Sequence, residues 1–304
     1  MHYSNIKVLG IETSCDECSA SVVQEHQGDL SVLSLVTFSQ IKIHKPYGGV
    51  VPEIASRNHL ETIQNIIAKA MQKANMQFSE LSAIAVTNRP GLIGSLLVGV
   101  SAAKSLSYVF EKPLLSIHHL EGHATSLFLD AKTDHQIKYQ MLLGIISGGH
   151  TNLYLVHESP EHWSKDFLKT RLIGCSRDDA AGEAFDKIAK LMGFPYPGGI
   201  YLDRNAQGGD PNRFSFPRAL AQKTHYDFSF SGLKTAAALE IQKQKVQGVF
   251  NKNKKDLCAS VQEAIIDTIL RKIYLAVQNF NCKTIALGGG VAANSRLRER
   301  LANE

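Results

Sequence analysis

The sequence has no segment suited to crossing a membrane or directing export. Its longest apolar run, residues 92–103, is interrupted by glycine and serine and is followed by Lys104. That run is shorter than the ~18 residues needed to span a bilayer. Residues 1–24 lack the charged, apolar and cleavage regions of a signal peptide. We therefore expect no membrane association and a cytoplasmic location.

Cysteine is scarce, which argues against a disulfide framework and against a cysteine-based zinc site. The five cysteines are an odd number, and only Cys15 and Cys18 form a C-x-x-C pair. A structural zinc site needs four ligands, and no second pair is present. A redox role would require a thioredoxin-like context, which is also missing. We therefore expect no disulfide, redox or zinc function for these cysteines.

The chain lacks a strong excess of either charge. Its 33 basic and 28 acidic residues leave a net charge of +5, which permits an anionic partner such as nucleic acid without requiring one. The lysine-rich segment 243–255 is typical of a solvated loop, and an RNA-facing patch is the alternative. At about 150 residues per domain, the 304 residues predict two domains or lobes.

Two similar stretches begin the two halves of the chain. Residues 9–23 and 143–156 each predict a strand, a turn rich in small polar residues, and a second strand. Such turns can direct several backbone N–H groups at one point and bind phosphate, although two ordinary hairpins would show the same pattern. We therefore predict an α/β fold of two duplicated lobes, 1–138 and 139–304, with a nucleotide between them.

The hydrophobic periodicity elsewhere also predicts an α/β fold. The helices expected from it span 56–74, 94–109, 178–192 and 256–280, and a further helix contains Arg296, Arg298 and Arg300. The strands expected from it span 84–87, 114–117 and 283–287. On the first helix the buried face is expected to carry Leu60, Ile63, Ile67, Ala70 and Ala74. Pro197 to Gly199 predicts a tight turn, and Gly288 to Gly290 allows close approach of a ligand to the backbone.

A cluster of histidines follows the predicted strand 114–117. His123 lies four residues after His119, about 40° round a helix, so both rings could bind one metal. A zincin protease needs a glutamate directly after the first histidine, but Leu120 stands there and Glu121 lies about 200° round the helix. The geometry therefore excludes the protease and retains the metal site, with a hydrogen-bonded loop as the alternative.

The chain resembles the TsaD family, formerly called O-sialoglycoprotein endopeptidase or Gcp, along nearly its whole length. The similar blocks are GIETSCDE (10–17), YGGVVPE (47–53), GSLLVG (94–99), HHLEGH (118–123), SGGHT (147–151), DDAAGEAFDK (178–187), YPGG (196–199), DFSFSGLK (227–234) and GGVAAN (289–294). The resemblance implies the actin-like, sugar-kinase-type ATPase (ASKHA) fold. It also implies transfer of threonylcarbamoyl from threonylcarbamoyl-AMP to N6 of adenosine 37 in tRNAs that read codons beginning with A.

The resemblance also implies a set of site residues. His119 and His123 would bind one divalent metal, Fe²⁺ or Zn²⁺. The adenine nucleotide or adenylate would be bound by Ile145, Ile146, Ser147, Gly148, Gly149, Asp186, Gly199, Asp203 and Asn294. The alternatives are an ordinary exposed helix acid for Asp186, an acid at a helix start for Asp203 and a helix cap for Asn294. His150 is a speculative general base, with a structural hydrogen bond as its alternative.

The resemblance further implies partners and a missing ligand. The substrate would be a tRNA anticodon loop, and the enzyme would act with a TsaB-like paralogous subunit and a TsaE-like small ATPase. In the family, the third metal ligand is an aspartate that would follow Glu304, the last residue of this sequence. The resemblance therefore predicts that the chain is truncated and catalytically impaired. A small-molecule kinase and a non-catalytic scaffold on the same fold are the competing hypotheses.

Overall fold

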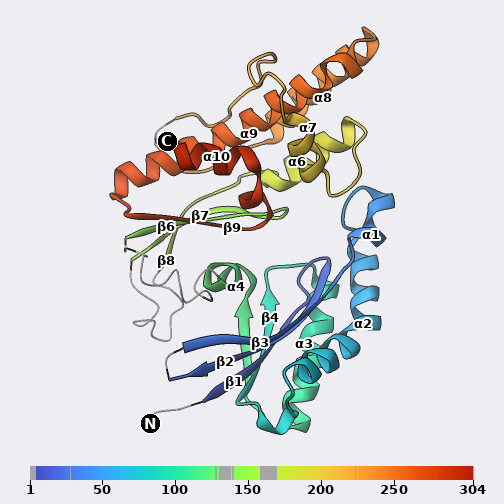
Figure 1. Ribbon diagram of the computed structural model, residues 1–304, viewed down its shortest axis with the longest axis vertical. Coiled ribbons are helices and arrows are strands. Elements are labelled where there is room, and N and C mark those ends of the chain that lie inside the picture. The colour runs from blue at the N-terminus through green and yellow to red at the C-terminus, as the bar shows by residue number, and fades with distance from the viewer. Residues whose placement is uncertain are drawn as a thin grey trace. The chain divides into compact units, whose positions relative to one another are not determined.

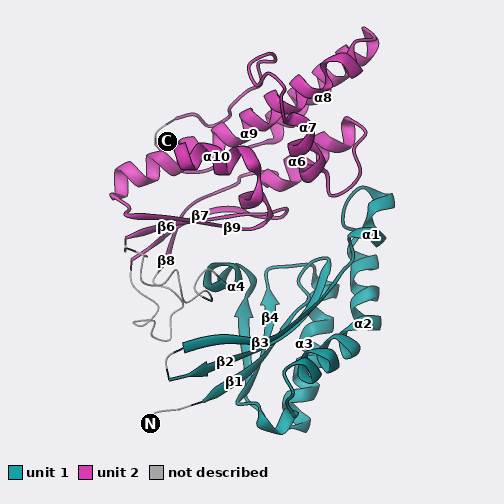
Figure 2. Cartoon of the chain, in the orientation of Figure 1, with its two compact units in different colours: residues 1–135 teal, residues 136–304 magenta. Residues whose placement is uncertain are grey.

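The computed structural model describes residues 5–27, 29–126, 129, 138, 140–157, 170–222 and 224–303. The chain divides into two compact units, Met1–His135 and Gln136–Glu304 (Figure 2). Within the described part, no helix is both long and apolar enough to cross a membrane.

Unit 1 is built on a five-stranded sheet with the order β3-β2-β1-β4-β5 (Figure 1). Its strands are β1 (Ile6–Glu12), β2 (Glu17–His26), β3 (Asp29–Ser39), β4 (Ala83–Arg89) and β5 (Leu114–His118). The first three are antiparallel, whereas β1, β4 and β5 are parallel. The described helices are α1 (Ile41–His44), η1 (Lys45–Tyr47), α2 (Pro52–Lys73), η2 (Phe78–Glu80), α3 (Ile93–Val109) and α4 (His119–Thr125). The helices α2 and α3 pack against the sheet and close its apolar core.

Unit 2 is built on a four-stranded sheet with the order β8-β7-β6-β9. Its strands are β6 (Met141–Ile146), β7 (Thr151–Val156), β8 (Thr170–Cys175) and β9 (Thr284–Gly288). Its described helices are α6 (Ala181–Leu191), α7 (Gly198–Ala206), α8 (Ser231–Val246), α9 (Phe250–Phe280), η5 (Gly290–Ala293) and α10 (Ser295–Asn303). Apolar side chains of α6, α8 and α9 form the core of this unit together with β6 and β7.

The two units repeat one strand arrangement, as the two similar stretches predict. The order β3-β2-β1-β4 of unit 1 matches β8-β7-β6-β9 of unit 2. In both, the first strand pairs antiparallel with the second and parallel with the fourth. The hairpins β1–β2 and β6–β7 are the two stretches singled out in the sequence. Strand β5 is an addition at the edge of the sheet of unit 1.

Several local predictions need correction. Helix α6 begins at Ala181 rather than Asp178, because Asp178 accepts hydrogen bonds from Ser229, Ser231 and the backbone of Phe230. On α2, Leu60 was placed on the buried face but is 69% exposed.

The remaining corrections concern where helices begin in unit 2. Gly198 and Gly199 form the first turn of α7 instead of a tight turn. Helix α9 starts at Phe250, six residues before Asp256, so the lysine-rich segment lies in helices rather than in a solvated loop.

Candidate functional site

The histidine pair lies at the start of α4, directly after β5. The Nε2 atoms of His119 and His123 are 3.1 Å apart, and their rings meet edge to face. The preceding residue, His118, caps the helix instead, because its Nδ1 accepts a hydrogen bond from the backbone N–H of Leu120. The short helix therefore directs both of its histidine rings at one point, as their spacing predicts.

Glu12 and Ser14 at the end of β1 orient the ring of His119. Glu12 Oε2 lies 3.2 Å and Ser14 Oγ 3.0 Å from His119 Nδ1. Burial acts to raise the pKa of Glu12, but hydrogen bonds from His119, Ser14 and Thr87 outweigh it and lower the pKa to about 2. The ionised carboxylate favours a proton on Nδ1 of His119, which leaves the lone pair of Nε2 facing His123.

This arrangement fits a pair of metal ligands. Two histidine nitrogens bound to one tetrahedral metal lie about 3.3 Å apart, close to the observed separation. A carboxylate on the second ring nitrogen is the usual support for a metal-binding histidine. Burial lowers the pKa of His123, which favours the neutral form that binds metal. Across the described residues, no third His, Cys, Asp or Glu completes a metal-binding group.

The pair does not have the arrangement of a zincin protease. Leu120 occupies the position where the catalytic glutamate would stand, and its side chain is buried. The metalloprotease interpretation therefore has no base in this helix.

In unit 2, the turn between β6 and β7 presents open backbone. A Cβ added at Gly148 or Gly149 would meet nothing within 4 Å, so a ligand could approach this backbone closely. The turn is closed by the Ser147 N–H, which donates to the His150 carbonyl, and by the His150 N–H, which donates to Ser147 Oγ. Gly182 in the first turn of α6 contacts the turn so tightly that an added Cβ would lie 2.6 Å from the Ser147 carbonyl oxygen.

Asp186 is tied to the start of α7. Its Oδ1 accepts hydrogen bonds from the N–H groups of Gly198, at 2.7 Å, and Gly199, at 3.0 Å. These are two of the N–H groups that a helix leaves unpaired at its N-terminus. The structure thus brings Asp186 and Gly199 together, in an arrangement that also stabilises the helix start.

Asp203 and Asn294 meet around Gln262 of α9. Gln262 Nε2 donates to Asp203 Oδ1 at 2.8 Å and to Asn294 Oδ1 at 3.2 Å. Asn294 also caps α10 by accepting from the Leu297 N–H, and Asp203 accepts from the hydroxyl of Ser295. Sequence reasoning did not single out Gln262, because nothing in its local pattern distinguishes it from any polar residue on a long helix.

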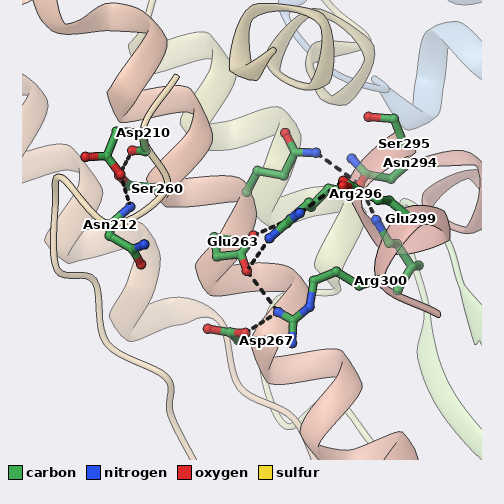
Figure 3. Close-up of polar contacts among 12 residues, drawn as sticks. Asp210, Asn212, Ser260, Glu263, Asp267, Asn294, Ser295, Arg296, Glu299 and Arg300 are labelled. Atoms are coloured by element: carbon green, nitrogen blue, oxygen red, sulfur yellow. Dashed lines mark hydrogen bonds and ion pairs between the residues drawn. The ribbon is translucent and has the colours of Figure 1, made fainter. Parts of the chain in front are cut away.

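A pocket of about 220 Å³ lies beside this group, within unit 2. It is lined by Asp203, Ala206, Gln207, Gly208, Gly209, Pro211, Ala259, Gln262, Glu263, Ser295, Arg296 and Glu299. Ion pairs fix the wall formed by α9 and α10 (Figure 3). Arg296 binds Glu263 through Nε and Nη2, and Arg300 contacts both Glu263 and Asp267. The pocket is therefore polar and has a pre-formed wall.

Comparison with solved structures identifies the class of fold. HypF from T. kodakarensis matches with a TM-score of 0.56 and 13% identity, over 98% of this chain and 43% of its own length. Component A of the (R)-2-hydroxyglutaryl-CoA dehydratase from Acidaminococcus fermentans matches with a TM-score of 0.53 and 14% identity, over 98% of this chain and 88% of its own. The chain is thus an α/β protein with the actin-like ATPase fold.

Sequence relatives then identify the family. The family model TsaD, tRNA N6-adenosine threonylcarbamoyltransferase, matches residues 31–304. A tRNA N6-adenosine threonylcarbamoyltransferase of Desulfitobacterium hafniense is 45% identical over 98% of this chain and 83% of its own length. A tRNA N6-adenosine threonylcarbamoyltransferase of Fervidobacterium nodosum is 46% identical over 97% of this chain and 83% of its own length. The chain belongs to the TsaD family of tRNA N6-adenosine threonylcarbamoyltransferases.

Proposed function

We propose that this chain transfers the threonylcarbamoyl group of threonylcarbamoyl-AMP to N6 of an adenosine in the anticodon loop of tRNA. The observation that carries the proposal is the family match, which extends over residues 31–304 with about 45% identity to enzymes of that name. The donor already has a good leaving group, whereas the adenosine amine is a weak nucleophile. The task of the protein is therefore to align the two and to stabilise charge on the carbamoyl oxygen.

The histidine pair would hold one divalent metal, Fe²⁺ or Zn²⁺. Support comes from the 3.1 Å separation of the two Nε2 atoms and from the carboxylate of Glu12 behind His119. A bound metal of this kind supplies a Lewis acid that polarises a carbonyl oxygen. The protein itself would direct the two rings, since Glu12 contacts His119 Nδ1 and burial lowers the pKa of His123.

In unit 2, the backbone of Ile145 to Gly149 and the polar group around Asp203 and Asn294 would bind the adenylate. The open backbone at Gly148 and Gly149 suits a phosphate, and the pocket beside Asp203 suits a small polar ligand. Asp186 and Gly199 would support this region through the start of α7. His150, in the same turn, is the candidate for accepting the proton of the amine.

The enzyme would act with a TsaB-like subunit and a TsaE-like small ATPase. The exposed apolar side chains on α2 and α3 support a protein partner on unit 1, since Leu60, Ile93, Leu97, Tyr108 and Val109 are all more than half exposed. Size-exclusion chromatography of the purified chain with each partner tests this directly.

The function is tested by incubating the chain with its partners, a tRNA transcript and threonylcarbamoyl-AMP. Mass spectrometry of the digested tRNA should detect threonylcarbamoyl-adenosine. The double variant His119→Ala/His123→Ala should lose this product together with bound metal, while His118→Ala retains both. A product formed equally by the double variant would refute the role of the metal site. ATP hydrolysis that depends on a sugar, with unmodified tRNA, would favour the small-molecule kinase.

A further inference from the structure

The net positive charge of this chain is concentrated in one short segment. Residues 241–255 contain five lysines and no acidic residue. Without these five, the chain has 28 basic and 28 acidic residues. A scattered excess of charge would have little meaning, but an excess confined to 15 positions makes a local positive field.

The segment spans the turn that joins α8 to α9. Lys243 and Lys245 lie in the last turn of α8, and the other three lysines lie in the first two turns of α9. Helix α9 has 31 residues and is about 46 Å long, and β9 follows its C-terminal end. The turn between α8 and α9 therefore lies at the end of the helix pair that is farthest from the sheet of unit 2, as Figure 1 shows.

The lysines are not neutralised by neighbouring carboxylates. Among the described residues, they form one ion pair, between Lys243 and Glu240 at 3.8 Å. Lys245 and Lys254 instead lie over the same ring, with their Nζ atoms 5.2 Å and 5.6 Å from the centroid of Phe250. Lys245 Nζ also donates a hydrogen bond to the carbonyl oxygen of Leu191 at 2.9 Å, so its position is fixed without a carboxylate.

The turn that carries the lysines is held rigidly. A buried chain of hydrogen bonds runs from Asn253 Nδ2 to Gln244 Oε1 and from Gln244 Nε2 to Glu240 Oε1. Gly248 has φ +71°, which ends α8 in the left-handed conformation that glycine favours. The positive groups are therefore presented at defined positions rather than on a loose loop.

The position of the charge also works against the stability of α9. Helix N-termini favour acidic residues, yet the first turn of α9 contains none. It contains Lys252, and Lys254 and Lys255 follow directly. Such a local conflict with helix stability is expected where a surface serves a function.

We propose that the lysines at 243, 245, 252, 254 and 255 form a docking surface for the phosphate backbone of tRNA. This inference rests on the proposed function, which supplies an RNA substrate. Lysine contacts to phosphate contribute affinity without sequence preference, and so would suit an enzyme that acts on several tRNAs. Aromatic rings position two of the five lysines, since Lys245 and Lys254 lie over Phe250 and Lys254 Nζ also lies 4.0 Å from the centroid of the Phe194 ring.

The test is binding of a fluorescent tRNA transcript to the full chain over a series of salt concentrations. In the variant with all five lysines changed to glutamine, the Kd at moderate salt should rise at least roughly ten-fold. The slope of log affinity against log salt should become less steep by about 3.5 to 4.5, because each of the five lost phosphate contacts removes about 0.7 to 0.9. The charge-preserving variant with five arginines should bind like the wild type, which separates loss of charge from loss of fold.

The matched control changes five exposed lysines of unit 1 to glutamine, namely Lys42, Lys45, Lys69, Lys73 and Lys104. Its tRNA affinity and salt slope should equal those of the wild type. If the variant in segment 241–255 binds tRNA as well as the wild type does, the inference is overturned. The inference is also overturned if that variant binds tRNA normally but no longer binds a partner subunit, because the surface would then bind an acidic protein.

The modification assay separates this inference from the proposed function. If the wild-type chain and the lysine variant modify tRNA equally well at limiting tRNA, the docking surface is overturned and the proposed function stands. If the wild-type chain neither binds nor modifies tRNA, both the docking surface and the proposed function are overturned.

Discussion

Glu12 is the single residue that supports the proposed metal ligand His119 from behind. Its carboxylate lies 3.2 Å from His119 Nδ1, so Nε2 is the ring nitrogen left for the proposed metal. Replacing it should weaken metal binding without removing a ligand. We expect Glu12→Gln to lower metal affinity by roughly ten-fold, the lower end of the range for such supporting residues.

Competition with a coloured chelator measures this affinity for Zn²⁺. Glu17→Gln is the control, because Glu17 is an exposed carboxylate that lies five residues farther along the chain. Equal affinity of Glu12→Gln and Glu17→Gln would show that the carboxylate does not support the pair.

Gly182 packs directly against the turn between β6 and β7 of unit 2, which is the proposed phosphate-binding turn. An added Cβ would lie 2.6 Å from the Ser147 carbonyl oxygen and 2.8 Å from Gly148 Cα, so the backbone of the turn would have to move. We expect Gly182→Ala to cost about 1–3 kcal/mol in the free energy of unfolding and to weaken binding of adenine nucleotides. Urea unfolding and isothermal titration with ADP measure the two effects.

The matched control is Gly232→Ala in the first turn of α8. A Cβ there would meet nothing within 4 Å, so the substitution should leave stability unchanged or raise it by about 0.5–1 kcal/mol. Nucleotide affinity that is the same in both variants would contradict the role assigned to Gly182.

At the scale of elements, the pair α8 and α9 is joined by a buried polar link. Asn253 is 8% exposed and donates to Gln244, which is 6% exposed. Removing the donor would leave the Gln244 oxygen buried without its partner. We expect Asn253→Ala to lower the free energy of unfolding by about 1–3 kcal/mol.

Asn251→Ala serves as the control, since Asn251 lies exposed on the same turn of α9. Its effect should stay within about 0.5 kcal/mol. A comparable loss of stability in both variants would show that the buried link makes no special contribution, because alanine is itself the better helix former.

Across the whole molecule, the two units should respond to acid over different ranges of pH. Burial lowers the pKa of four histidines of unit 1 below the ordinary 6.5, namely His44, His59, His118 and His123. In unit 2, burial acts to raise the pKa of several aspartates, but hydrogen bonds and neighbouring cations outweigh it. Their pKa values therefore lie below the ordinary 3.8, and the residues are Asp178, Asp179, Asp227 and Asp267.

In both units the shifted pKa values make the fold less stable as pH falls, but over different ranges of pH. A group with a folded pKa below its unfolded value stabilises the fold above the unfolded pKa and loses this as pH falls. Unit 1 should therefore weaken below about pH 6.5, and unit 2 only below about pH 3.8. Hydrogen exchange of the metal-free chain between pH 7.5 and 5 should show protection lost first in unit 1. Protection lost first in unit 2 would contradict these assignments.

Local sequence pattern was enough for many of the elements and for part of the candidate site. Apolar spacing predicted α3 and β4 closely, and the four-residue interval placed His119 and His123 on one face. These features depend on neighbours within one or two turns, so the helical and extended periods determine them. The repeat of the strand–turn–strand pattern likewise predicted the duplicated sheets.

Only the tertiary structure decided which distant side chains meet. Glu12 reaches His119 across 107 positions, and Gln262 joins Asp203 and Asn294 across 59 and 32. The lysine-rich segment was predicted as a loop because lysine, glycine and asparagine are common in solvated chain. Packing of α9 against the core of unit 2 overrode that preference and extended the helix back to Phe250. Helix formation in proteins depends mainly on such packing, which no local window of sequence contains.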